Sequence, residues 1–236
     1  MKFPAESILV IRMSGIGDVL WTTPLLANLR RAYPTAHIAY VVRTASAFVL
    51  ENNPDVDEVL LFEREDIPWQ IGFLRRLRKR RFDLSIDLIC SPATAIQSVV
   101  SGARTRIGFD FRIREKLYNH RLSAREANAG HEVEFNLAVL PFMEIPVRTR
   151  SLVWCVSADE RTYAEAVWRR LGLGEEETVV GLVPTGGFPS KKWPVDHWRS
   201  LTKHPALADM RFLVFCGSEQ ERHDATMIAE GSGGRI

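Results

Sequence analysis

The sequence predicts a doubly wound α/β fold, in which parallel strands carry helices on both faces. Three observations predict it: strand-like and helix-like segments alternate, the first strand is a continuous apolar run, and glycine-containing turns follow several strands. Continuous apolar runs are typical of strands buried on both faces, and alternation with helices favours a parallel sheet. The chain has 236 residues, 46% hydrophobic and 25% charged, which suffices for a large core or two smaller ones.

The first strand, at 7–13, runs into the turn Ser14-Gly15-Ile16-Gly17, and a helix follows until Pro34 stops it. The start of this helix has two interpretations: Asp18 caps the helix, or Thr23 caps it with Pro24 at the first helical position. The alternation then continues through the first half. Further strands are expected at 37–42, 58–62, 82–88 and 105–109, and helices near 46–52, 69–81, 92–100 and 131–143.

A change of pattern at 144–150 predicts a linker, because Pro146 breaks the helical periodicity there. We therefore expect a first domain at 1–150 and a second at 151–236. In the second, helices are expected at 157–171, from about 196 and at 219–229, and strands at 178–183 and 211–216. Doubly wound nucleotide-binding sheets usually have about five or six strands, so the second domain is expected to be incomplete.

Composition excludes several classes of protein. A net charge of +2 is too weak to predict a nucleic-acid partner. The cysteines and histidines show no metal-ligand spacing, so no metal site is expected. No apolar run approaches the roughly 18 residues of a membrane span, and the expected location is cytoplasmic.

Asp55-Val56-Asp57 is interpreted as a turn. The basic run Arg75–Arg81 is either a solvated helix end or a peripheral contact with an anionic leaflet on the inner face of the membrane.

The loop that contains Ser14, Gly15, Gly17 and Asp18 follows the first strand, where the ligand crevice of an open α/β sheet lies. Glycines allow close approach to a ligand, and Asp18 is either a general base or a plain helix cap. The loop is not a dinucleotide fingerprint, because Leu20 replaces the third glycine.

A second loop, 184–194, occupies the equivalent place in the second domain. Backbone amides at two glycines, a hydroxyl and lysines suit the pyrophosphate of a nucleotide sugar, although a solvated surface turn has the same composition. The loop offers the amides of Gly186 and Gly187, the hydroxyls of Thr185 and Ser190, and the cations of Lys191 and Lys192. Glu219 follows the last strand and either accepts hydrogen bonds from a ribose or complements a helix dipole.

At these loops the sequence resembles the lipopolysaccharide heptosyltransferase family. The matching stretches are Ile8–Leu20 with Thr23-Pro24-Leu25, Lys191-Lys-Trp-Pro194 and Phe215-Cys-Gly-Ser-Glu219, with weaker matches at 82–88 and 131–140. They run in family order across nearly the whole chain.

The resemblance implies a GT-B-type fold of two Rossmann-like domains and an inverting, metal-independent transfer from ADP-heptose to a lipid-linked oligosaccharide of the inner core. It implies that no cofactor is required. It assigns Asp18 as catalytic base, Lys191 to the donor phosphates and Glu219 to the donor ribose, with Thr185, Gly186 and Gly187 in the phosphate loop.

One departure leaves two hypotheses open. Family members continue with a segment of the form Asp-Ser/Thr-Gly…His, which this sequence lacks. The first hypothesis is a glycosyltransferase; the second is a truncated, non-catalytic module that binds an acceptor or a partner. A nicotinamide-dependent enzyme ranks third, because Arg43 stands where an acidic ribose-binding residue is expected.

Overall fold

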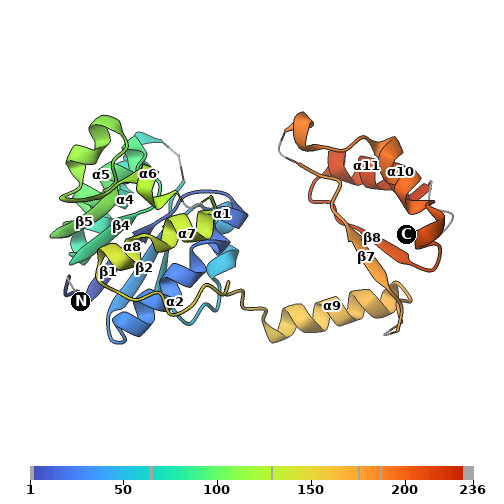
Figure 1. Ribbon diagram of the computed structural model, residues 1–236, viewed down its shortest axis with the longest axis horizontal. Helices are drawn as coiled ribbons and strands as arrows, with labels where there is room; N and C mark the ends of the chain where they lie inside the picture. The colour runs from blue at the N-terminus through green and yellow to red at the C-terminus, as the bar shows by residue number, and fades with distance from the viewer. Residues whose placement is uncertain (1–2, 64–65, 129, 175, 187, 231–236) are drawn as a thin grey trace. The chain divides into compact units, whose positions relative to one another are not determined.

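The chain folds into two compact units, Met1–Ser157 and Ala158–Ile236 (Figure 1). The computed structural model describes residues 3–63, 66–128, 130–174, 176–186 and 188–230. The unit boundary lies after Ser157, because residues beyond 150 still contact the first unit. The amide of Val153 donates to Thr23 Oγ1 at 2.9 Å, and the ring of Trp154 lies edge-on to Phe48.

In the described part of the first unit, six parallel strands lie in the order β3-β2-β1-β4-β5-β6. The strands are β1 (Ser7–Ile11), β2 (His37–Val42), β3 (Glu58–Leu61), β4 (Leu84–Asp87), β5 (Thr105–Phe109) and β6 (His120–Leu122). In register, Ile8 lies opposite Ile38 on one side and Leu84 on the other. The strand order reverses between β1 and β4, and in such sheets ligands bind at the carboxyl ends of the strands that flank this reversal. The predicted doubly wound α/β class is confirmed.

Helices cover both faces of this sheet (Figure 1). They are α1 (Ile16–Leu20), α2 (Thr23–Ala32), α3 (Thr44–Ala47), α4 (Ile67–Arg80), α5 (Pro92–Val100), α6 (Ala124–Ala127), α7 (Glu132–Leu137) and α8 (Val139–Phe142), with 3₁₀ helices η1 (Phe48–Leu50) and η2 (Arg112–Leu117). Side chains alternate between the two faces along a strand. Ile8 and Val10 pack in one core with Leu25 of α2, and Leu9 packs in the other core with Phe73 of α4.

The start of the first helix differs from both predicted starts. The segment is divided into α1 and α2, and Gly15 is the N-cap of α1, so Asp18 lies inside the first turn. Thr23 does not cap α2 either, since its hydroxyl donates to Leu20 O at 2.8 Å. Thr22 precedes α2 and shares a hydrogen bond of 2.8 Å with the buried hydroxyl of Tyr40.

Two features between 110 and 143 were not predicted. β6 has three residues, too few for a period to be read from the sequence, and it closes the edge of the sheet beside β5. The helix predicted at 131–143 is divided into α7 and α8. Pro141 has no backbone N–H for the carbonyl of Leu137, which ends α7 at that residue.

The second unit is smaller. Its described residues form two parallel strands, β7 (Val179–Leu182) and β8 (Arg211–Val214), with helices α9 (Ala158–Arg170), α10 (Val195–Thr202) and α11 (Glu219–Glu230) and 3₁₀ helices η3 (Pro189–Lys191) and η4 (Pro205–Leu207). Its buried core consists of Leu182, Phe212 and Ile228. Each strand leads at its carboxyl end into a loop that carries predicted site residues.

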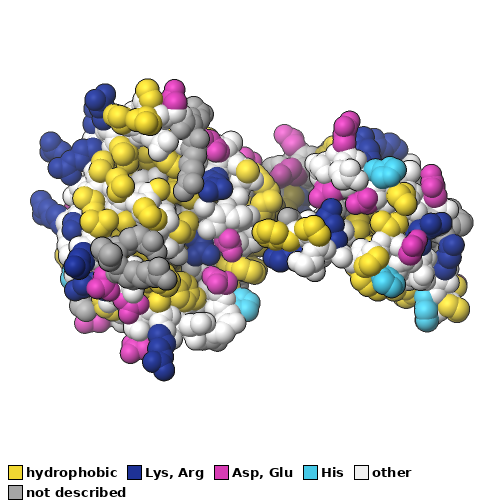
Figure 2. Space-filling view, turned by 90° about the horizontal axis from the view of Figure 1, so that it is seen from above, with side chains coloured by type: hydrophobic (Ala, Val, Ile, Leu, Met, Phe, Trp, Pro, Cys, Tyr) yellow, Lys and Arg dark blue, Asp and Glu magenta, His cyan; other side chains and the backbone are white. Residues whose placement is uncertain are grey.

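On the surface of the first unit, hydrophobic side chains gather on one face and Lys and Arg side chains lie along its edge (Figure 2). The exposed apolar residues of α4 and α5 include Ile67, Ile71, Ile96 and Val99. Among the described residues, no helix combines the length and the apolar character that crossing a bilayer requires.

Candidate functional site

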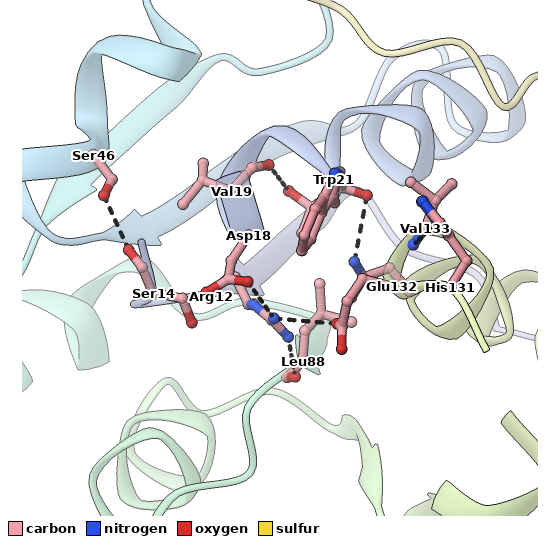
Figure 3. Close-up of polar contacts among 12 residues, drawn as sticks. Arg12, Ser14, Asp18, Val19, Trp21, Ser46, Leu88, His131, Glu132 and Val133 are labelled. Carbon is pink, nitrogen blue, oxygen red and sulfur yellow. Dashed lines mark hydrogen bonds and ion pairs between the residues drawn. The ribbon is translucent and has the colours of Figure 1, made fainter. Parts of the chain in front are cut away.

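The loop between β1 and α1 lies at the carboxyl edge of the sheet, where the strand order reverses. Its backbone is anchored by Ser46, whose hydroxyl donates to Ser14 O at 3.0 Å (Figure 3). Among the residues that the structure describes, a Cβ atom at Gly17 would meet no atom within 4 Å, so space is open above this residue. A Cβ atom at Gly15 would have Asp18 Oδ2 as its nearest neighbour, at 3.9 Å. Ser14, Gly15, Gly17 and Asp18 are thus brought together in one turn.

Asp18 is held beside a buried arginine. Arg12 extends β1 by one residue and is 8% exposed. Its Nη1 donates to Leu88 O at 2.8 Å, and its Nη2 lies 3.6 Å from Asp18 Oδ1 and 3.5 Å from Glu132 Oε2 (Figure 3). The Asp18 side chain is 37% exposed, so one edge of the carboxylate faces solvent while the other faces the guanidinium.

A pocket of about 440 Å³ opens next to Arg12. Its polar lining is Arg12, Ser14, Asn128, His131 and Glu132, and its apolar lining includes Ile89, Phe111 and Phe135. Polar groups that converge on apolar walls are the usual composition of a small-molecule site.

The position of α7 brings Glu132 into this pocket. His131 is the N-cap of α7, because its Nδ1 accepts from the amide of Val133 at 3.1 Å. Asn136 is fully buried and donates to Trp21 O at 3.3 Å, which fixes α7 against the end of α1. The ring of His131 also lies edge-on to Trp21.

Arg12, His131 and Glu132 were not predicted from the sequence as site residues. A signal exists for Arg12, since a charge that directly follows four fully buried apolar residues is unusual. For Glu132 there is none: it is 120 positions from Arg12 and reads as ordinary first-turn charge of a helix.

A second carboxylate, Asp87 at the end of β4, is completely buried. Burial raises the pKa of Asp87, and hydrogen bonds from the amides of Cys90 and Ile89 and from the Tyr118 hydroxyl partly offset this. With three donors bound and no exposed surface, Asp87 orders the β4 loop rather than facing a ligand.

In the second unit, the loop after β7 folds back on itself. Thr185 and Gly186 are half-buried, and Gly187 lies outside the described residues. A Cβ at Gly186 would lie 3.3 Å from Lys191 Cβ, so the glycine and the lysine are neighbours. Lys191 Nζ lies 5.6 Å from the centroid of the Phe188 ring and is exposed. Backbone amides and an ammonium group that adjoin in this way can bind an anion.

Glu219 is the first residue of α11 and is exposed, directly after the loop that follows β8. The neighbouring Glu221 satisfies the helix start, since its Oε2 accepts from the amide of Gly217 at 2.7 Å. Because β7 and β8 are adjacent parallel strands, Glu219 and the Lys191 loop follow the same edge of that small sheet.

The two other charged motifs have local partners. Asp57 accepts from the amide of Ile38 at 2.7 Å and pairs with Arg30, as expected for a turn that docks on a strand. In the basic run, Arg80 pairs with Glu58, whereas Arg75 and Lys79 are exposed.

A family model described as glycosyltransferase family 9 (heptosyltransferase) matches residues 71–234. The chain is 26% identical over 232 residues to lipopolysaccharide heptosyltransferase 3 of Escherichia coli, which covers 91% of this chain and 64% of that protein. It is 24% identical over 228 residues to lipopolysaccharide heptosyltransferase 2 of Salmonella typhimurium, covering 92% and 65%. The chain thus spans less than two thirds of the length of these relatives.

Solved structures share the fold. A glycosyl transferase family 9 protein from Veillonella parvula superposes with a TM-score of 0.85 at 20% identity, covering 98% of this chain and 67% of that one. The E. coli heptosyltransferase WaaC with ADP gives a TM-score of 0.70 at 22% identity, covering 97% and 72%.

Proposed function

The chain belongs to glycosyltransferase family 9, the heptosyltransferase family, and from this we propose that the protein transfers heptose from ADP-heptose to the inner core of lipopolysaccharide. The observation that carries the proposal is a half-exposed carboxylate, Asp18, at the sheet edge where this fold binds ligands, in a chain that matches the family over residues 71–234.

The proposed reaction is a single displacement at C1 of the heptose. The acceptor hydroxyl attacks C1 of the heptose on the face opposite the diphosphate, and its proton passes to Asp18. The bond between C1 and the β-phosphate oxygen breaks, its electron pair leaves with ADP, and the configuration at C1 inverts. Because Asp18 Oδ1 faces Arg12 and Oδ2 lies toward Gly15, Oδ2 is the oxygen available to the acceptor.

On the donor side, the proposed role of Lys191 is to neutralise the charge that develops on the departing diphosphate, without a metal ion. The amides at Gly186 and Gly187 and the hydroxyl of Thr185 would contact the same phosphates, and Glu219 would accept from the ribose. The relative WaaC was crystallised with ADP, which agrees with a diphosphate ligand for this fold.

On the acceptor side, we assign the pocket beside Arg12 to a sugar of a lipid-linked oligosaccharide. The turn at Ser14, Gly15 and Gly17 gives that sugar access to Asp18, because open space lies above Gly17. Apolar walls with Phe111 and Phe135 suit the C–H face of a sugar ring, and the polar groups suit its hydroxyls.

The direct test mixes the protein with ADP-heptose and a core oligosaccharide acceptor and measures ADP release and the glycosylated product. We expect equal amounts of both, unchanged by EDTA. A protein that binds ADP-heptose but releases no ADP with any core acceptor would overturn the transferase and support the alternative, a non-catalytic binding module.

We further propose that the protein works at the inner face of the cytoplasmic membrane, held peripherally through Arg75–Arg81. The basis is that Arg75 and Lys79 are exposed on α4, in the same four-residue spacing as the exposed apolar residues Ile67 and Ile71.

Sedimentation with phosphatidylcholine vesicles, with and without phosphatidylglycerol, tests the membrane contact. We expect binding only to the anionic vesicles, weaker at high salt and lost in the double variant Arg75→Glu, Lys79→Glu. The matched control reverses two charges on α9, Arg161→Glu and Arg170→Glu. Equal binding by both double variants would contradict a contact through α4.

A further inference from the structure

Arg12 occupies a position that fold stability alone does not explain. It is 8% exposed and directly follows the four completely buried residues Ile8–Ile11, and within the described structure its Nε has no hydrogen-bond partner. A buried charge with an unsatisfied N–H is costly, and apolar replacements of buried ion pairs are often neutral or stabilising. The contacts of Arg12 therefore point to a role in the site.

The guanidinium joins four parts of the first unit. It extends from β1, donates to Leu88 O after β4, and lies between Asp18 of α1 and Glu132 of α7 (Figure 3). The two carboxylates are nearly equidistant from the same nitrogen, at 3.6 and 3.5 Å. Nη2 carries two N–H groups, so it can serve both carboxylates at once.

We propose that Glu132 and Arg12 are positioning residues that set how tightly Asp18 is held. This rests on the proposed function. Arg12 fixes Oδ1 of Asp18, which leaves Oδ2 free for the acceptor hydroxyl. Glu132 shares the positive charge of Arg12, so the attraction on Asp18 is weaker than a lone guanidinium would exert, and Asp18 remains a competent base.

Four charged or titratable groups lie around Arg12 and Asp18. Arg12 comes from β1, Glu132 and His131 from α7, and Tyr40 from β2, where it interacts electrostatically with Asp18 and Arg12. Of these, Glu132 can be changed with little disturbance of the fold, because 48% of its side chain is exposed.

The first variant is Glu132→Gln. Without the second carboxylate, Arg12 acts on Asp18 alone, which favours the ionised base and makes it weaker. We expect the acidic limb of the kcat–pH profile to move down by about half a unit or more, and the plateau kcat to fall about threefold or more, with the donor KM unchanged.

The matched control is Glu134→Gln on the same helix. Glu134 Oε1 accepts from Arg150 Nε at 2.7 Å on the surface, so its loss removes an equal charge from α7 without touching Arg12. The pH profile of this variant should overlay that of the wild type.

A second pair of variants changes Arg12. In Arg12→Met, Asp18 loses its cation, and the acidic limb should move up, opposite to Glu132→Gln. Arg12→Lys keeps the charge but not the planar fork, so it should restore the position of the limb while recovering only part of kcat. A purely structural role would not shift the limb in opposite directions.

The outcomes separate this inference from the proposed function. A wild-type protein that transfers no heptose defeats the proposed function. A wild-type protein that does transfer heptose, with a pH profile that Glu132→Gln leaves in place, overturns the positioning role alone.

Discussion

At the scale of single residues, the two lysines of the second-unit loop have different surroundings. Lys192 Nζ lies 4.0 Å from Asp224, whereas Lys191 rests over Phe188 beside Gly186. Of the two, Lys191 is therefore the cation that adjoins the loop amides. The family resemblance assigns Lys191 to the donor phosphates, and Lys192 is less available because it pairs with Asp224.

We predict that Lys191→Gln weakens ADP binding by about tenfold or more, because a charge-assisted contact is lost. Isothermal titration with ADP measures this, and Lys192→Gln is the matched control, expected to stay within about twofold. If Lys192→Gln lost as much affinity as Lys191→Gln, the assignment between the two would be wrong.

Asp87 and Asp57 are predicted to make the stability of the protein depend on pH in opposite directions. Burial raises the pKa of Asp87, so as pH rises from about 4 the unfolded chain ionises this group first and the folded state loses stability relative to Asp87→Asn. Burial also opposes ionisation of Asp57, but hydrogen bonds from Ile38 and Arg30 outweigh it and lower its pKa. The stability that Asp57 contributes is therefore present above about pH 4 and lost below it.

Urea unfolding at several pH values measures both effects. As pH rises, the free energy of unfolding of the wild type should fall relative to that of Asp87→Asn. Relative to Asp57→Asn, it should increase. Parallel curves for either variant would contradict the assigned direction for that residue.

At the scale of elements, one close contact joins β5 to the segment that precedes β6. A Cβ at Gly108 would lie 2.7–2.8 Å from three carbons of the Tyr118 ring, so only glycine lets this ring lie flat on β5. The same ring carries the hydroxyl that donates to Asp87 at 2.7 Å. The contact thus links β5 to the β4 loop beneath the site.

Gly108→Ala is predicted to destabilise the protein by about 1–3 kcal/mol, because the ring cannot move without losing its hydrogen bond. Gly72→Ala, in the interior of α4 with ordinary space for a methyl group, should instead stabilise it by about 0.5–1 kcal/mol. Chemical denaturation compares the two. A neutral Gly108→Ala would show that the contact is not tight.

Elements with a strong local signal were predictable and those without one were not. The buried strands β1 and β2 read as apolar runs, and their positions agree with the prediction to within a few residues. β6 is too short for periodicity, and its pairing with β5 depends on tertiary contacts. In the same way, the turn with Asp18 was predictable from strand, glycine and helix signals, but the contact of Arg12 with Glu132 spans 120 positions.

At the scale of the whole molecule, the two units differ in how much core supports their strands. Leu9, Val10, Ile38 and Tyr40 in the first unit are completely buried. In the second unit, β7 has one buried residue, Leu182, and Gly181 is exposed. Asp18, the candidate base, therefore lies in the unit with the larger buried core, and the donor-binding candidates lie in the unit with the smaller one.

Hydrogen exchange is predicted to separate the units. Amides of β1, β2 and β4 should exchange at the slowest rates, and those of β7 and β8 faster, because opening the smaller core exposes less apolar surface. Mass spectrometry of peptides from each strand measures this. ADP should slow exchange in the second unit selectively, since a ligand stabilises the state that it binds. Uniform exchange across all strands would contradict the division.

The central claim is that Asp18 removes the acceptor proton while other residues hold the donor. The most direct measurement is the single-turnover rate of heptose transfer by Asp18→Asn, taken together with its affinity for ADP. We predict that the rate falls by about 100-fold or more while ADP affinity stays within about twofold. A variant that keeps most of the wild-type rate would show that Asp18 is not the base.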